Sequence, residues 1–229
     1  MPVKELQHEM VMSHLRVRRA LGWLGVFLPV VLIIGGIINE SEPTISDFYH
    51  TAFRDLYVGT LCAIGIFLIA YKGHPPKGAD VWDTNKVNDN RLTNIAGVAA
   101  LVMAFFPNLP TTQGIAPITQ AGVLSLASPP IHYIGALFFF TTLGLICLKQ
   151  FARSNNEDDA RFYRRCGYVI FAALAATMIA VVFRRFTEGP GHQLVEDNNI
   201  IFWFEAFGTW AFAAAWLRKG RAQKEAVTG

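Results

Sequence analysis

The chain has 229 residues, of which 52% are hydrophobic and only 16% are charged. Soluble globular domains carry about 25% charged residues, so this composition disfavours a water-soluble enzyme domain and predicts an integral membrane protein. The formal net charge of +3 is small, and no nucleic acid partner is expected. At this length, one helical domain is expected rather than two.

Six apolar segments alternate with charged ones along the chain. Stretches of about 18 or more apolar residues are candidates for membrane-spanning helices; four of the six reach that length, and the second and third fall slightly short. We predict an all-α fold with six transmembrane helices in one bundle over 20–217, between a basic N-terminal segment (1–19) and a basic tail (218–229). The predicted helices are 20–38, 55–71, 92–107, 131–148, 166–183 and 200–217.

The positive charges predict how these helices are oriented in the membrane. Of the 20 Lys and Arg residues, 17 lie in 1–19, 72–91, 149–165 and 218–229. The opposite side has only Arg54, Arg184 and Arg185. Because positive charge stays on the cytoplasmic side during insertion, we expect both termini in the cytoplasm, with a bacterial inner membrane as the location.

Three connecting segments carry further expectations. Glu5–Arg19 is basic and is expected to form a short helix lying on the inner membrane surface. Lys72–Arg91 contains Gly, Pro and Asp and is expected to be a loop. Thr111–Pro130 carries no charge; it is either a re-entrant or interfacial segment or a plain loop.

Several polar side chains are predicted near the outer ends of the helices, where each needs a partner because the membrane interior disfavours polar groups. Asp47, His50 and Arg54 share one face if the stretch before the second span is helical. His132 opens the fourth span. Glu205 lies about five residues into the sixth, ~8 Å below its start at a rise of 1.5 Å per residue.

These residues predict one polar ligand-binding site open to the outer face of the membrane. Its expected members are Ser46, Asp47, His50, Arg54, Asp55, His132, Arg184, Arg185 and Glu205. The simplest partner for the carboxylate of Glu205 is one of the three arginines. A structural network of ion pairs clamping the second, fifth and sixth helices would use the same residues, so both interpretations stay open.

Three functions fit such a site. The first is binding or sensing of a small ligand, ion or lipid head group, in which a histidine beside a carboxylate responds to pH. The second is a membrane-embedded lipid hydrolase with Asp55, His132 and Glu205 as catalytic groups, in which His50, Asp55, His132 and Glu205 could hold a zinc ion. The third is an accessory membrane subunit. No oligomeric state follows from the sequence.

The stretch Ser46, Asp47, His50 and Asp55 resembles the Ser, His and Asp signature of the alkaline-ceramidase and progestin-receptor-like membrane hydrolases. That superfamily has seven helices and an HxxxH pair in the last one, whereas 200–217 contains no histidine.

Other short strings resemble a group of uncharacterised bacterial multi-pass membrane proteins over roughly 20–220. These strings are Ile45–Thr51, Arg54–Gly65, Ile131-His132, Phe202–Glu205 and Trp216–Gly220. The Ile-Ser-Asp motif before a helix and the span that begins at histidine are also similar, more distantly, to the Frag1/DRAM/Sfk1-like six-helix family. The resemblance implies a six-helix bundle with Ser46–Asp55, His132 and Glu205 as the segments of interest, and it implies no substrate.

Overall fold

A computed structural model of the chain describes residues 3–38, 41–71, 89–108 and 124–228. All the secondary structure in these ranges is helical, which confirms the all-α prediction. The six long helices are α1 (Val3–Ile38), α2 (Arg54–Ala70), α3 (Asp89–Phe105), α4 (Leu124–Leu145), α5 (Glu157–Phe186) and α7 (Ile200–Thr228). Each contains nearly all of one predicted apolar segment.

Four helical stretches are long and apolar enough to cross a membrane, which indicates an integral membrane protein. They are Leu15–Ile38, Leu126–Arg153, Glu157–Phe186 and Ile200–Arg221. The helices α2 and α3 are shorter, with 17 residues each.

Several helix boundaries differ from the predicted ones: α5 begins at Glu157 rather than at 166, and α7 continues past 217 to Thr228. Glu5–Arg19 forms no separate surface helix, because α1 continues through it without a break. The fourth long helix begins at Leu124 rather than near 131, with Pro129 and Pro130 inside it. Residues 111–123 of the predicted uncharged segment lie outside the described ranges, as do residues 72–88 of the predicted loop.

In the described ranges, four short helical elements connect the long ones. After α4 the backbone widens into a π-helical turn (Ile146–Gln150) and a 3₁₀ turn (Phe151–Arg153) before α5. Between α1 and α2 lies the 3₁₀ helix η1 (Ser46–His50), and between α5 and α7 lies α6 (Pro190–Asp197). No helix was predicted in the region of α6, which has only eight residues.

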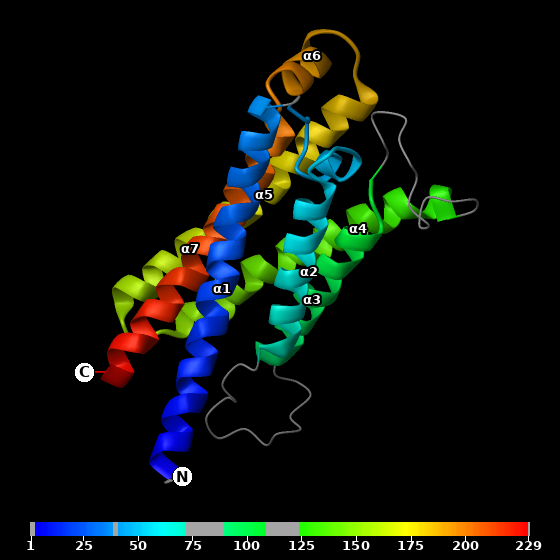
Figure 1. Cartoon of the computed structure of the whole chain (residues 1–229). Coiled ribbons are helices and arrows are strands. Elements are labelled where there is room, and N and C mark those ends of the chain that lie inside the picture. Colours follow the sequence, from blue (N-terminus) through cyan, green and yellow to red (C-terminus); the bar gives the residue numbers. More distant parts are fainter. Residues whose placement is uncertain (1–2, 39–40, 72–88, 109–123, 229) are drawn as a thin grey trace.

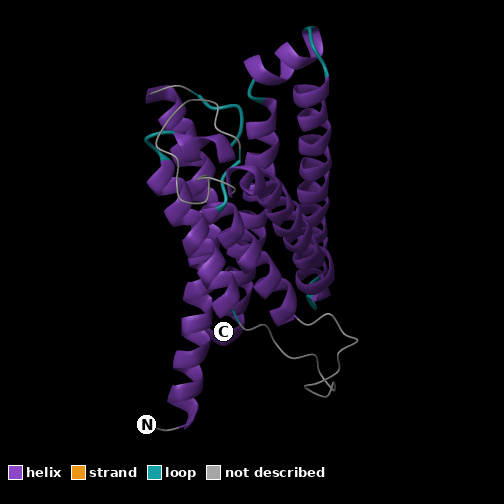
Figure 2. Ribbon diagram, turned by 90° about the vertical axis from the view of Figure 1, so that its right-hand side faces the viewer, coloured by secondary structure: helices purple, strands orange, loops and turns teal. Residues whose placement is uncertain are grey.

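The long helices form two groups of three, α1 with α7 and α5, and α2 with α3 and α4 (Figure 1). The groups meet where α1 contacts α2 and where α4 contacts α5. Both termini lie at one end of the bundle, and η1 and α6 lie at the other (Figures 1 and 2). We call this second end, which comprises Pro43–His50, α6 and the first turns of α7, the distal end.

Small residues allow the helices within a group to approach closely, as is typical of helix packing in membranes. A Cβ atom added to Gly22 of α1 would lie 2.5 Å from Cγ of Leu217 in α7. Between α2 and α3, a Cβ atom on Gly65 would lie 2.8 Å from the carbonyl oxygen of Gly97, and one on Gly97 would lie 2.6 Å from that of Gly65. The backbones of α2 and α3 therefore touch directly.

We predict that Gly97→Ala destabilises the bundle by about 1–3 kcal/mol, because the added methyl group overpacks the contact between α2 and α3. The control is Gly59→Ala on α2, where an added Cβ atom meets nothing within 4 Å. Unfolding of the purified variants in detergent provides the measurement. Equal stability of the two variants would contradict direct backbone contact at Gly97.

Candidate functional site

The site is built around the segment Pro43–His50, which packs against the start of α7. The carbonyl oxygen of Pro43 accepts a hydrogen bond of 3.0 Å from the backbone N–H of Phe202, one of the first N–H groups of α7. The N–H of Ile45 donates to Oε2 of Glu205 at 2.7 Å. Within the segment, the hydroxyl of Thr44 accepts from the N–H of Asp47 at 3.0 Å. The side chains of η1 are therefore held at fixed positions beside α7.

His132 of α4 makes a hydrogen bond through each ring nitrogen. Its Nδ1 lies 2.8 Å from the carbonyl oxygen of Phe106, and its Nε2 lies 2.9 Å from Oγ of Ser46. Because a carbonyl oxygen only accepts, Nδ1 carries the proton and Nε2 accepts the hydroxyl proton of Ser46. Both side chains are buried, with His132 only 2% exposed.

Asp47 is at the centre of a chain of charged and polar groups. It is 1% exposed, and its Oδ1 accepts from the side-chain amide of Asn108, three residues beyond the end of α3. Its Oδ2 lies 3.4 Å from Nη1 of Arg184 in α5, and Arg184 also pairs with Glu196 of α6. We call these residues, Asn108, Asp47, Arg184 and Glu196, the ion-pair chain. It connects η1 with the segment after α3, with α5 and with α6.

Glu205 does not have the arginine partner that the sequence predicts. Its carboxylate accepts from the backbone of Ile45, and none of the ion pairs among the described residues includes it. Arg54 instead donates to the hydroxyl of Tyr49 at 2.9 Å and lies over its ring. Arg185 donates to the hydroxyl of Tyr133 at 3.3 Å. The reason is the path of Pro43–His50, which brings a backbone donor to Glu205 and places Asp47 beside Arg184.

Among the described residues, neither His50 nor Asp55 forms a hydrogen bond with Ser46 or His132. Nε2 of His50 is 3.2 Å from the carbonyl oxygen of Asn108, and burial lowers the pKa of His50 below its ordinary value. Asp55 is exposed, in the first turn of α2, and the described part of the chain offers it no hydrogen bond or ion pair. Thr51 is extended between η1 and α2, so the predicted common helix face of Asp47, His50 and Arg54 does not form.

A cavity of about 360 Å³ lies between α4, α5 and α7, within the ~300–1,000 Å³ typical of ligand sites. Its polar lining consists of Thr44, Ser46, Asn108, Thr177, His132, Tyr133, Arg184, Arg185 and Glu205. The rest is apolar and includes Ile134, Leu137 and Met178, which are 44–55% exposed. The cavity therefore has a polar part and an apolar wall that reaches the outer surface of the bundle.

The zinc site considered from the sequence has no ligand set in the described ranges. They contain no group of three or more His, Cys, Asp or Glu residues arranged to hold a metal ion. Of the predicted ligands, His132 already makes a hydrogen bond through each ring nitrogen, and Asp55 is exposed to solvent.

The sequence interpretation missed two members of the ion-pair chain. Asn108 is a polar residue at the outer exit of the third predicted span, a position equivalent to those that drew attention to His132 and Arg184. Glu196 lies on α6, whose start is marked by Gly189 with φ 86° followed by Pro190 in the first helical position.

No protein-family model, curated protein or solved structure matches the chain.

We predict that Asp47→Asn destabilises the protein by roughly 3 kcal/mol, because it removes one partner of a buried ion pair. The matched control is Asp158→Asn, whose partner Arg161 forms an exposed pair at 2.7 Å and which is expected to cost at most about 1 kcal/mol. Thermal unfolding in detergent compares the two variants. A cost for Asp47→Asn no larger than that of the control would show that the ion-pair chain does not stabilise the distal end.

Proposed function

We propose that the chain is a bacterial inner-membrane protein with six membrane-spanning helices and both termini in the cytoplasm. In this proposal, the cavity between α4, α5 and α7, which we call the distal cavity, binds the polar head of one amphipathic, anionic molecule, such as a lipid, from the outer leaflet. The observation that carries the proposal is the cavity of about 360 Å³, which combines a polar part with an exposed apolar wall.

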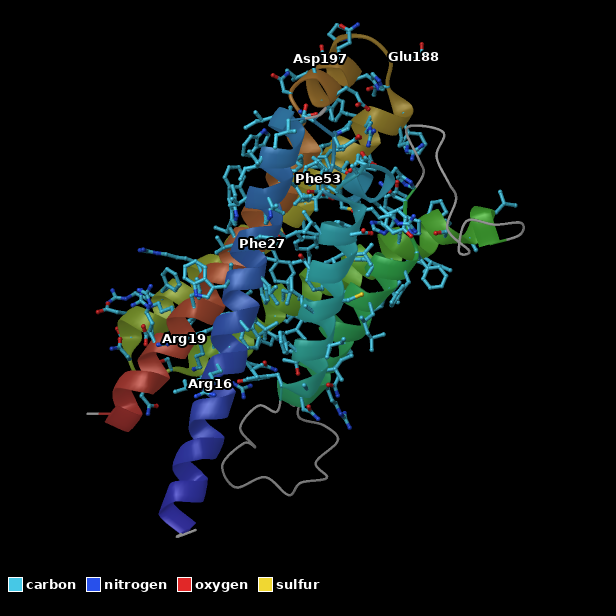
Figure 3. The ribbon with its side chains drawn as sticks, viewed as in Figure 1. Arg16, Arg19, Phe27, Phe53, Glu188 and Asp197 are labelled. Carbon is cyan, nitrogen blue, oxygen red and sulfur yellow. The ribbon has the colours of Figure 1, made fainter. Side chains whose placement is uncertain are left out.

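The distribution of charge supports the topology. Arg16 and Arg19 lie toward the end that holds the termini, whereas Glu188 and Asp197 lie at the opposite end (Figure 3). The 17 residues of α2 and of α3 reach ~25 Å at 1.5 Å per residue, slightly less than the ~30 Å of a bilayer core. The tight contact of α2 with α3 would keep such short spans in the bundle.

The arginines of α5 support the anionic character of the ligand. Arg184 already pairs with two carboxylates. Arg185 lines the same cavity, is exposed, and has no carboxylate partner among the described residues. An arginine of this kind suits a phosphate or carboxylate group, to which its planar guanidinium can donate two hydrogen bonds.

The apolar wall supports an amphipathic ligand. Ile134 and Leu137 of α4 and Met178 of α5 line the cavity and remain partly exposed on the bundle surface. In a membrane this surface faces lipid, so an acyl chain could enter from the side while its head group stays near Arg185.

The sequence left two interpretations of these polar residues open, a ligand-binding site and a structural network. We assign each interpretation to different residues. Asp47 and Arg184 belong to the ion-pair chain and stabilise the distal end. Ser46, His132, Arg185 and Glu205 line the cavity and remain as the ligand-binding groups.

We predict that a reporter enzyme active only outside the cytoplasm is active when fused after Thr112 and inactive when fused after Lys224. The expected result follows from the excess of Lys and Arg on the side of the termini. Reporter activity in whole cells, normalised to the amount of fusion protein, provides the measurement. Activity after Lys224 would overturn the proposed orientation.

We predict that Arg185→Gln and Leu137→Trp each weaken binding of dioctanoyl phosphatidylglycerol about tenfold, which corresponds to ~1.4 kcal/mol. The first variant removes the unpaired cation, and the second fills the apolar wall. Native mass spectrometry of the purified protein at increasing lipid concentration measures the affinity.

Two control variants match these substitutions. Arg164→Gln removes an exposed arginine at the other end of α5, and Ile66→Trp enlarges an exposed residue of α2 that is 57% exposed and does not line the cavity. If the controls weaken binding as much as the cavity variants, the lipid binds to the general surface and the proposal is wrong.

A further inference from the structure

We infer that Ser46 and His132 form a catalytic nucleophile and general base that cleave an ester bond of the amphipathic molecule bound in the distal cavity. This inference rests on the proposed function, because it takes the ligand of that cavity as its substrate. It adds a reaction, carried by a serine, to a site so far assigned only to binding.

Ser46 and His132 have the geometry of a nucleophile and its base. Serine is a weak nucleophile unless an adjacent base accepts its proton, and the base must itself be oriented by a third group. Here Oγ of Ser46 lies 2.9 Å from Nε2 of His132. The carbonyl oxygen of Phe106, 2.8 Å from Nδ1, keeps the proton on the far nitrogen, which is the part that a carboxylate plays in a serine protease triad.

The pair also lies where a bound substrate could reach it. Ser46 and His132 both line the cavity of about 360 Å³. Ser46 also lines a second cavity of about 20 Å³, together with Tyr57 and Glu205, which has room for one water-sized group. A substrate acyl group next to Ser46 could therefore place its carbonyl oxygen in the smaller space.

A buried hydroxyl lies beside that space. Tyr57 is fully buried, and its hydroxyl interacts with Ser46 but makes no hydrogen bond of ordinary geometry in the described part of the chain. Leaving a buried donor without a good hydrogen bond is costly. A donor that is already in position beside the reacting carbonyl stabilises the negative charge that develops on its oxygen during acyl transfer. The geometry assigns Tyr57 as this donor.

The reaction balances without any further cofactor. Oγ of Ser46 bonds to the acyl carbon while its proton passes to Nε2 of His132, and the ester C–O bond breaks as the leaving alcohol takes that proton. The acyl group is then held on Ser46 as an ester. Water attacks the acyl carbon and gives its proton to His132, the bond to Ser46 breaks, and the proton returns to Oγ as a carboxylic acid leaves.

A second buried serine provides a matched control. Oγ of Ser128 donates to the carbonyl oxygen of Pro107 at 2.8 Å. A carbonyl oxygen cannot remove the hydroxyl proton at neutral pH, so Ser128 is not activated even though it is fully buried in the same helix as His132.

The experiment treats the purified full-length protein in detergent with an alkyl fluorophosphonate, which bonds to an activated serine oxygen and releases fluoride. Peptide mass mapping of the wild-type protein identifies the labelled residue. We expect labelling at Ser46, none in Ser46→Ala, unchanged labelling in Ser128→Ala, and labelling at least about 100-fold slower in His132→Gln. Thermal unfolding establishes that each variant is folded.

The outcomes separate this inference from the proposed function. Binding of dioctanoyl phosphatidylglycerol is measured on the same wild-type sample. Lipid binding without labelling, or labelling at a residue other than Ser46, overturns the catalytic assignment alone. Loss of both lipid binding and labelling in folded wild-type protein overturns both proposals. Labelling at Ser46 that His132→Gln does not slow would show that His132 is not the base.

Discussion

Burying a polar group without a hydrogen-bond partner is costly, and this cost determines how the elements at the distal end of the protein pair with one another. Pro43–His50 carries free backbone groups and a carboxylate into a bundle of apolar helices, where each unsatisfied group would cost roughly 1–3 kcal/mol or more. Several of these groups have a partner from another element: Phe202 and Glu205 from α7, His132 from α4 and Arg184 from α5. One short segment thus joins both three-helix groups, and the cavity exists beside it.

Hydropathy was sufficient to predict the six long helices, because a continuous apolar run in a membrane leaves the backbone no other way to pair its N–H and C=O groups. The boundaries were less predictable. Pro129 and Pro130 resemble a helix start, yet α4 begins five residues before the first of them. The basic residues before 20 resemble a separate surface helix, yet they continue α1. The eight residues of α6 are too few for a periodic pattern to stand out.

The sequence placed several polar residues at one end of the bundle, but it did not predict how they pair. Ser46, Asp47, His132, Arg184 and Glu205 do gather at one end of the bundle, as polar residues at the ends of neighbouring spans should. Which of them touch depends on the path of a non-helical segment, and hydropathy carries no information about that path. Glu205 accepts a hydrogen bond from the backbone N–H of Ile45. Because almost every residue has such an N–H group, no side-chain pattern in the sequence could predict this partner.

The ion-pair chain also has a consequence for how the protein is made. Asp47 is synthesised 137 residues before Arg184, and Ile45 is synthesised 160 residues before Glu205. Closing such long loops adds little entropy cost, about 0.6 kcal/mol for each doubling of length. The contacts that hold Pro43–His50 against α5 and α7 can therefore form only after both of those helices have been synthesised.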